Sequence, residues 1–126
     1  MPIAGLGLDL VQIERIEDLL RRRGPRARDR LFTAAEQAYC ERRARAAASY
    51  AGRFAVKEAV MKLLGTGWTR GVRWVDIEVV RLPGQAPSVA LHGETARIAA
   101  ALRIAKIHIT ITHDGGLAAA VAVAER

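Results

Sequence analysis

The chain has 126 residues, and 20 Lys+Arg against 13 Asp+Glu give it a formal net charge of +7. This length excludes a pair of large domains, so we expect a single domain over residues 1–126. Apolar residues make up 51% of the chain, which excludes a disordered tail. No apolar stretch approaches the roughly 20 residues of a membrane span, and the N-terminus lacks the pattern of a signal peptide. With Cys40 as the single cysteine, we expect a cytoplasmic protein with no membrane partner.

The basic excess comes from arginine, with 17 Arg against 3 Lys, and six of these arginines fall within residues 21–30 beside one acid, Asp29. Arginine suits phosphate and carboxylate recognition, so we expect an acidic partner. Nucleic acid is one candidate. However, none of the six aromatic residues lies within this cluster, so a stacking platform for single strands is unsupported. An acidic protein surface or a polyphosphorylated small molecule fits equally well, and a solvated face is the structural alternative.

Hydrophobic periodicity and local stop signals divide the chain into short elements. Helix boundaries are indicated by Gly24-Pro25, by the capping box of Thr33 and Glu36, and by Gly65. In chain order, the expected elements are a strand at 3–10, a helix at 11–23, a helix capped by Thr33, a helix at 44–64, strands at 74–82 and up to Leu91, a helix at 94–102, and strands at 106–112 and 117–124. This order favours an α+β fold with an antiparallel sheet.

Charged residues cluster on the expected helix at 44–64. Arg53, Lys57 and Glu58 fall within about one turn, and Glu58 forms an i,i+4 pair with Lys62. Such a face could bind a metal ion through Glu58 and phosphates through the cations. The alternative is an exposed helix that carries an ordinary ion pair.

Asp9 is the only acid in an otherwise apolar segment, and it lies where the first strand gives way to the first helix. An acid near a helix start commonly satisfies free backbone amides, which is the structural alternative for Asp9. Mg²⁺ typically takes only one or two protein carboxylates and completes its shell with water and substrate phosphate. Asp9 and Glu58 are therefore sufficient for a magnesium site if they converge.

The strand at 106–112 alternates strictly, which places His108, Thr110 and Thr112 on one face and three isoleucines on the other. One imidazole and two hydroxyls in a row could donate hydrogen bonds to phosphate oxygens. Equally, this row could be a solvent-facing side of the strand. His108 and His113 fall on opposite faces of the strand, so we do not expect a zinc site.

Four segments carry a family pattern in order and spacing. They are Gly5-Leu6-Gly7-Leu8-Asp9-Leu10 with Arg15-Ile16, then Leu31-Phe32-Thr33 with Glu36, then Arg53-Phe54-Ala55-Val56-Lys57-Glu58-Ala59 with Lys62 and Leu64-Gly65-Thr66-Gly67, and finally His108-Ile109-Thr110-Ile111-Thr112-His113 with Ala118-Ala119-Ala120. Together they resemble the holo-[acyl-carrier-protein] synthases, the small bacterial class of 4′-phosphopantetheinyl transferases, nearly end to end. Thr110 stands where serine is usual, and Asp114-Gly115-Gly116 replaces a threonine-led turn.

The resemblance implies the 4′-phosphopantetheinyl transferase fold and a Mg²⁺-dependent reaction that supports fatty acid biosynthesis. In it, 4′-phosphopantetheine passes from coenzyme A to a serine of apo-acyl carrier protein, and 3′,5′-ADP leaves. Asp9 and Glu58 would hold Mg²⁺, and Lys62 would contact the same phosphates. The general base stays open among Asp9, Glu58 and a water on the metal.

By the same resemblance, further residues would bind coenzyme A. They are Arg53, His108 and Thr110 at the 3′-phosphate, Lys57 among the cations of the helix, and Gly65, Thr66, Gly67 and Pro87 around the adenine. Arg15, Arg21 and Arg22 would dock the acidic carrier protein by electrostatic steering. The resemblance also implies a homotrimer with active sites between subunits and no nucleic-acid partner. Two alternatives are a basic nucleic-acid-binding domain and an inactive coenzyme-A-binding module.

Overall fold

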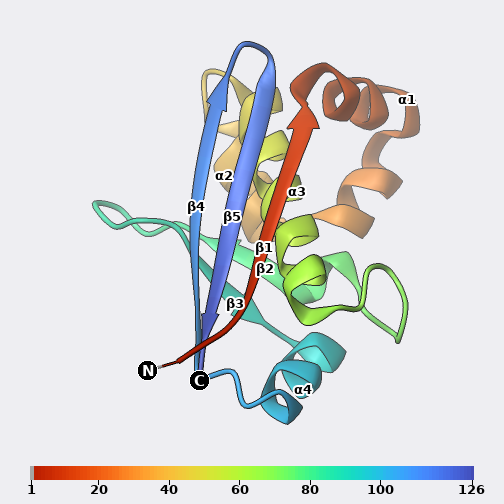
Figure 1. Cartoon of the computed structure of the whole chain (residues 1–126). Helices are drawn as coiled ribbons and strands as arrows, with labels where there is room; N and C mark the ends of the chain where they lie inside the picture. The colour runs from red at the N-terminus through yellow and green to blue at the C-terminus, as the bar shows by residue number, and fades with distance from the viewer. Residues whose placement is uncertain (1) are drawn as a thin grey trace.

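A computed structural model describes residues 2–126, and it confirms the expected mixture of helices and antiparallel strands. In chain order (Figure 1), the elements are β1 (Ile3–Gln12), α1 (Ile13–Leu31), α2 (Ala34–Glu41), α3 (Ala46–Leu64), a 3₁₀ turn η1 (Trp74–Asp76), β2 (Ile77–Val80), β3 (Ser88–Leu91), α4 (Gly93–Ala101), β4 (Lys106–Asp114) and β5 (Leu117–Glu125).

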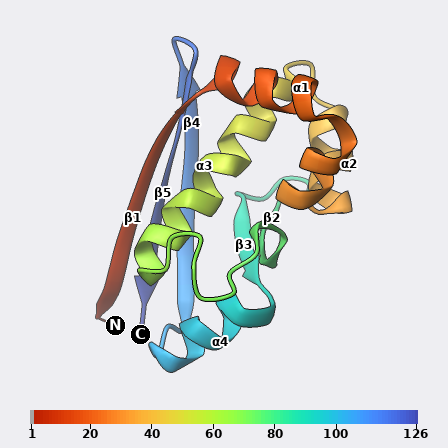
Figure 2. The same ribbon diagram turned by 90° about the vertical axis from the view of Figure 1, so that its right-hand side faces the viewer.

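The strands form two separate antiparallel sheets. One sheet has the order β1-β5-β4, and the other pairs β2 with β3. Helix α3 runs between these two sheets, while α1 crosses one end of the molecule and α4 lies at the other (Figure 2). In the larger sheet Asp9 pairs with Ala120, which in turn pairs with Ile111. Asp9 and Ile111 therefore lie on opposite edge strands, with β5 between them.

Helix α3 lies on a floor of very small side chains. The residues of β5 that face the helix are alanines, and all four are buried: Ala118, Ala120, Ala122 and Ala124. On β1 the helix meets Gly7, where an added Cβ would lie 1.8 Å from the carbonyl oxygen of Ala59. Small residues thus let the helix approach the sheet closely, and 13 of its 19 residues are buried.

The outer face of the larger sheet is unusually apolar. Leu6, Leu8 and Leu10 of β1 are each more than 60% exposed, whereas the small and acidic residues between them face α3. This reverses the usual arrangement, in which the large apolar side chains of a half-exposed sheet face the core. The reason is that α3 needs close backbone contact on the inner face, which leaves the leucines outside.

The local signals for helix ends are confirmed. Thr33 accepts a hydrogen bond from the backbone N–H of Glu36, and the Glu36 carboxylate accepts one from the N–H of Thr33, which closes the capping box of α2. Gly65 ends α3 with a φ of 75°, a conformation that glycine adopts without steric cost.

Several boundaries differ from the sequence expectation. Strand β1 continues through Gln12, because Val11 pairs with β5 rather than starting the helix. At Gly24, with φ of 67° and ψ of −153°, the first helix breaks as expected, but a second helical segment follows Pro25 up to Leu31. Proline suits the first position of a helix, since its missing N–H would have no partner there. The expected strand at 74–82 begins with the 3₁₀ turn η1.

Candidate functional site

Asp9 and Lys62 meet where β1 passes the C-terminal half of α3. The Lys62 ammonium donates one hydrogen bond to Asp9 Oδ1 at 3.0 Å and another to the carbonyl oxygen of Leu8 at 2.9 Å. Asp9 does not cap α1, because the N-cap position is Gln12 and has no side-chain cap. The capping alternative for Asp9 is therefore wrong, and its carboxylate belongs to a cluster with α3.

Glu58 completes this cluster from α3. Burial raises the pKa of Glu58 above its usual value, and the negative charge of Asp9 raises it further. The cations Lys62 and Arg15 and a hydrogen bond from Trp68 act in the opposite direction. The two carboxylates thus lie near enough to repel each other, so a cation placed between them would be stabilised by both.

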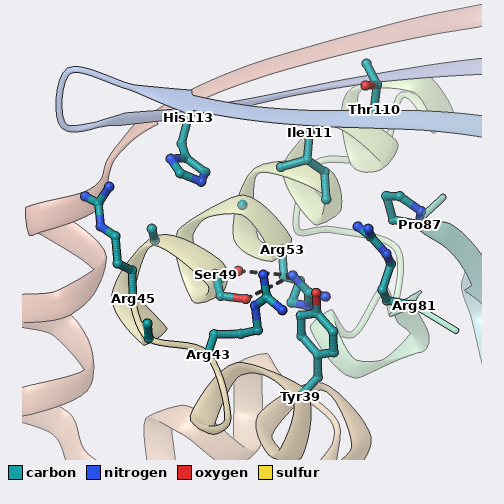
Figure 3. Close-up of a pocket in the computed structure, with 13 residues that line it drawn as sticks. Tyr39, Arg43, Arg45, Ser49, Arg53, Arg81, Pro87, Thr110, Ile111 and His113 are labelled. Carbon is teal, nitrogen blue, oxygen red and sulfur yellow. Dashed lines mark hydrogen bonds between the residues drawn. The ribbon is translucent and has the colours of Figure 1, made fainter. Parts of the chain in front are cut away.

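A cationic cavity of about 440 Å³ opens on the other side of α3, against β4 (Figure 3). Among residues 2–126, four arginines and one histidine line it, and no aspartate or glutamate does. The lining residues are Tyr39, Arg43, Ala44, Arg45, Ala48, Ser49, Gly52, Arg53, Arg81, Pro87, Thr110, Ile111 and His113. Such a cavity suits an anion with several oxygens, because each guanidinium offers a planar set of donors.

Arg53 is the deepest of these arginines, with only 6% of its surface exposed. Its Nη1 donates to the hydroxyl of Ser49 at 3.2 Å and lies 3.5 Å from the carbonyl oxygen of the same residue. Its buried Nε has no hydrogen-bond acceptor among residues 2–126. Buried polar groups normally have hydrogen-bond partners, so Arg53 is a buried guanidinium that uses only part of its hydrogen-bonding capacity.

The charged face expected on α3 does not exist as one surface. Arg53 lies in the cavity beside β4, while Glu58 and Lys62 face β1. Lys57 points into the core and is fully buried, and its ammonium donates to Glu36 Oε1 at 2.9 Å and to the carbonyl oxygens of Trp74 and Ile77. Three acceptors use all three of its donors. The structure therefore contradicts a coenzyme-binding role for Lys57, which ties α2 and β2 to α3 instead.

The expected residues of β4 divide between two faces of the strand. In Figure 3 the side chains of Ile111 and His113 point into the cavity, whereas Thr110 lines it from the edge and points to the opposite side of β4. His108 does not line the cavity. Its Nε2 lies 3.5 Å from Glu125 Oε1 on the outer face of the sheet. Within one chain, His113 is therefore the histidine of β4 that lines the cavity.

The glycine-rich loop at residues 65–67 and the turn that contains Pro87 do not line the same cavity. Pro87 lines the cavity. Gly65, Thr66 and Gly67 follow the C-terminal end of α3, on the side of Glu58 and Lys62, and do not line it. The Thr66 side chain is buried and donates a hydrogen bond to the carbonyl oxygen of Gly67, so it holds the loop in shape.

The arginines expected at a partner surface lie on the first segment of α1. Arg15 and Arg22 line a shallow groove together with Asp18, and Arg21 pairs with Asp18. Arg15 is also close enough to Glu58 to lower its pKa. The basic face of α1 therefore continues into the carboxylate cluster.

Sequence reasoning missed most of the cavity, and its missed polar residues are Tyr39, Arg43, Arg45, Ser49, Arg81 and His113. Arg43 and Arg45 belong to a group of three arginines between α2 and α3. This local concentration of positive charge was a sequence signal for an anion-binding site. Arg81 and His113 come from the ends of β2 and β4, and only the folding of these strands around α3 brings them together.

The family model of the 4′-phosphopantetheinyl transferase superfamily matches residues 5–122. The chain is 48% identical to a holo-[acyl-carrier-protein] synthase of Anaeromyxobacter dehalogenans, over 98% of this chain and 96% of that protein. Crystal structures of the synthases from Neisseria meningitidis and from Helicobacter pylori, the latter in complex with coenzyme A, match with TM-scores of 0.89 and 0.83. Their identities are 25% and 32%, with 99% and 95% of this chain covered and 100% and 99% of theirs. The chain therefore belongs to the holo-[acyl-carrier-protein] synthase family of the 4′-phosphopantetheinyl transferase superfamily.

Proposed function

We propose that this protein transfers 4′-phosphopantetheine from coenzyme A to a serine of apo-acyl carrier protein, in support of fatty acid biosynthesis. The observation that carries the proposal is the convergence of Asp9, Glu58 and Lys62, which come from segments about fifty residues apart. Relatives named holo-[acyl-carrier-protein] synthase, and the coenzyme A in the Helicobacter pylori structure, support the same reaction.

The carboxylate pair fits Mg²⁺. No group of three or more His, Cys, Asp or Glu side chains within residues 2–126 is arranged to hold a metal ion. Mg²⁺ does not require one, because it keeps several waters and takes one or two carboxylates together with substrate phosphates. Asp9 and Glu58 would hold the ion, and their mutual repulsion would be relieved by it. When bound, it supplies charge neutralisation at the pyrophosphate of coenzyme A.

Lys62 would contact the same pyrophosphate. Its side chain is 54% exposed, and two of its three ammonium donors are used on Asp9 and Leu8. The third donor is left for a phosphate oxygen. In the transfer, the serine oxygen forms a bond to the β-phosphorus, the bond from that phosphorus to the bridging oxygen breaks, and 3′,5′-ADP leaves with the electron pair. The serine proton passes to a general base, for which Asp9, Glu58 and a water are the candidates. Lys62 would stabilise the negative charge that develops on the leaving phosphate.

The cationic cavity would take the 3′-phosphate and adenine of coenzyme A. Arg53 is its deepest cation, and Pro87 supplies an apolar edge. His113 and Arg81 join them from β4 and from the loop that follows β2. A phosphomonoester carries nearly two negative charges at neutral pH, which matches a cavity lined by arginines without a carboxylate.

One copy of the chain offers the two halves of this site on opposite sides of α3. Asp9 lies on β1 and the cavity lies against β4, and the helix, roughly 10 Å across, stands between them. A single coenzyme A would reach both halves if β1 of one copy lay beside β4 of another. The divided site therefore calls for more than one copy of the chain, and the homotrimer that the resemblance implies would place active sites between subunits. Neighbouring copies would also cover the apolar outer face of the sheet.

The basic face of α1 would dock the carrier protein. Arg15, Arg21 and Arg22 lie on the same helix segment, and Arg15 reaches toward Glu58, so an acidic partner bound there would lie beside the reacting phosphates. Exchange of these three arginines for glutamate should raise the KM for carrier protein far more than the KM for coenzyme A. Equal changes in both KM values would reject this docking face.

The experiment that tests the function is incubation with coenzyme A, Mg²⁺ and an apo-acyl carrier protein, followed by intact mass spectrometry of the carrier. We expect a mass gain of one phosphopantetheine group, lost on addition of EDTA. Asp9→Asn and Glu58→Gln should abolish the gain. Glu94→Gln, which alters an exposed carboxylate paired with Arg97 on α4, is the matched control and should retain it.

Two results would contradict the proposal. Binding of coenzyme A without any mass gain on several carriers would indicate an inactive coenzyme-A-binding module. Failure to bind coenzyme A, together with salt-dependent binding to nucleic acid, would favour the basic-domain alternative.

A further inference from the structure

Tyr39 makes an unusual pair of contacts in the cationic cavity. The guanidinium carbon of Arg53 lies 4.1 Å from the centre of the Tyr39 ring, and that of Arg43 lies 5.4 Å from it. Both distances are within the range of a cation–π interaction. The three residues come from different segments, α3, the connection after α2, and α2 itself, and all three line the cavity (Figure 3).

The choice of a ring rather than a carboxylate matters for the charge of the cavity. Arg53 is almost fully buried, and a buried guanidinium normally pairs with an acid. Here no aspartate or glutamate lines the cavity, and the only hydrogen-bond acceptors for Arg53 within residues 2–126 belong to Ser49. The face of an aromatic ring attracts a cation without carrying a negative charge of its own. Arg43 and Arg53 can therefore be held in place without being neutralised.

The alternative arrangement would weaken anion binding. A carboxylate in place of the ring would hold the two guanidinium groups as firmly, but it would repel an incoming phosphate and compete with it for the same donors. Ser49 accepts hydrogen bonds from Nη1 of Arg53 alone, and no acceptor for Nη2 lies among residues 2–126, so the donors of Nη2 remain available to a ligand. The Tyr39 ring thus holds the two guanidinium groups in position, and their positive charge remains available to attract an anionic ligand.

We propose that Tyr39 is a positioning residue that holds Arg43 and Arg53 ready for the 3′-phosphate of coenzyme A. The inference rests on the proposed function, in which this cavity receives that phosphate. Tyr39 acts through the arginines, so it determines how well the enzyme distinguishes coenzyme A from 3′-dephospho-coenzyme A. It takes no part in the transfer at Asp9 and Glu58.

The test compares three proteins, wild type, Tyr39→Phe and Tyr39→Leu, on coenzyme A and on 3′-dephospho-coenzyme A, with carrier protein saturating. Phenylalanine keeps the ring face and removes only the hydroxyl, so Tyr39→Phe is the matched control. In Tyr39→Leu we expect the KM for coenzyme A to rise about tenfold, as loss of two partly buried cation–π contacts implies. The KM for 3′-dephospho-coenzyme A and kcat on both substrates should stay within about twofold.

The outcomes separate this inference from the proposed function. If wild type shows equal KM values for the two substrates, the assignment of the cavity to the 3′-phosphate fails. If wild type prefers coenzyme A and Tyr39→Leu prefers it to the same degree, the role of Tyr39 fails alone. An equal rise of both KM values in Tyr39→Leu, or an equal loss of preference in Tyr39→Phe, would also overturn it. The midpoint of thermal unfolding, measured for each variant, identifies general damage to the fold.

Discussion

At the scale of single residues, Gly7 sets the distance between β1 and α3, the two elements that carry the proposed magnesium site. An added Cβ at Gly7 would lie 1.8 Å from the carbonyl oxygen of Ala59 and 2.7 Å from its carbon, both backbone atoms of α3. Neither can move without the helix. Because Asp9 lies two residues after Gly7 on the same strand, any displacement of β1 from α3 also separates Asp9 from Lys62.

We expect Gly7→Ala to lower kcat at least a hundredfold and to lower the free energy of unfolding by about 1–3 kcal/mol, as overpacking does. Gly5→Ala is the matched control on the same strand, because its Cβ would meet Leu63 at an ordinary 3.5 Å. It should leave both quantities nearly unchanged. Turnover and urea unfolding measure the two effects. Equal behaviour of the two variants would show that the close approach at Gly7 does not matter.

Glu58 gives a second prediction at this scale, because its ionised form is disfavoured in the folded protein. Burial and the charge of Asp9 raise its pKa, so the folded state binds a proton more tightly than the unfolded state does. The stability contributed by that proton is present at low pH and is lost as the pH rises through the raised pKa. Glutamine at this position stays neutral at every pH.

In the absence of divalent ions, Glu58→Gln should therefore be more stable than wild type at pH 7.5, and this difference should shrink toward pH 4. With Mg²⁺ present, the variant should still be inactive. Urea unfolding at both pH values measures it. Addition of Mg²⁺ should stabilise wild type and not the variant, since only the native ion-binding pair gains from it. A wild type more stable than Glu58→Gln at pH 7.5 without Mg²⁺ would contradict the assignment.

At the scale of elements, a buried ion pair joins α3 to its neighbours. The Glu36 carboxylate closes the capping box of α2, accepts the backbone N–H of Val79 in β2 and pairs with Lys57. Both side chains are fully buried, so removal of one partner leaves the other charge without compensation. The pair keeps α2 and β2 in place against α3, and thereby the cavity that opens between α2, α3 and β4.

Lys57→Met should lower the free energy of unfolding by about 3–5 kcal/mol. Lys106→Met, at an exposed position of β4, is the matched control and should change it by less than about 0.5 kcal/mol. The double variant Lys57→Met with Glu36→Gln should recover part of the loss, because no unpaired charge remains. Denaturant unfolding of the three variants measures this. A Lys57→Met protein as stable as the control would refute a structural role for the pair.

At the scale of the whole molecule, the outer face of the larger sheet and the divided site point to assembly. Three leucines of β1 are exposed on this face, although large apolar patches on isolated chains are uncommon. No helix among residues 2–126 is long and apolar enough to cross a membrane. A second copy of the chain is the partner that would also complete the divided site.

Leu6→Glu should convert the assembly to monomers and abolish phosphopantetheine transfer, with the fold retained. Leu82→Glu is the matched control, because Leu82 is also more than half exposed but lies in the loop after β2, away from the sheet. Light scattering coupled to size exclusion measures the mass, and circular dichroism measures the fold. Transfer activity in a monomeric Leu6→Glu protein would show that one copy holds a complete site.

The sequence by itself determined the fold class, most of the elements and the residues of the carboxylate cluster. The reason is that turns, caps and strand alternation are local, so Thr33 with Glu36, Gly65 and the alternating segment around Ile109 specify structure within a few residues. The order and spacing of the motifs, including Asp9 and Glu58, are linear properties of the chain as well.

Only the tertiary structure decided which way the side chains of α3 point. This helix is buried between two sheets and has apolar residues on every side, so its periodicity does not distinguish one face from another. Arg53, Lys57 and Lys62 look equivalent in the sequence, yet they lie in the cavity, in the core and beside Asp9. Tyr39 and His113 could not be assigned to the cavity from the sequence, because a cavity lined by separate elements exists only once those elements pack against each other.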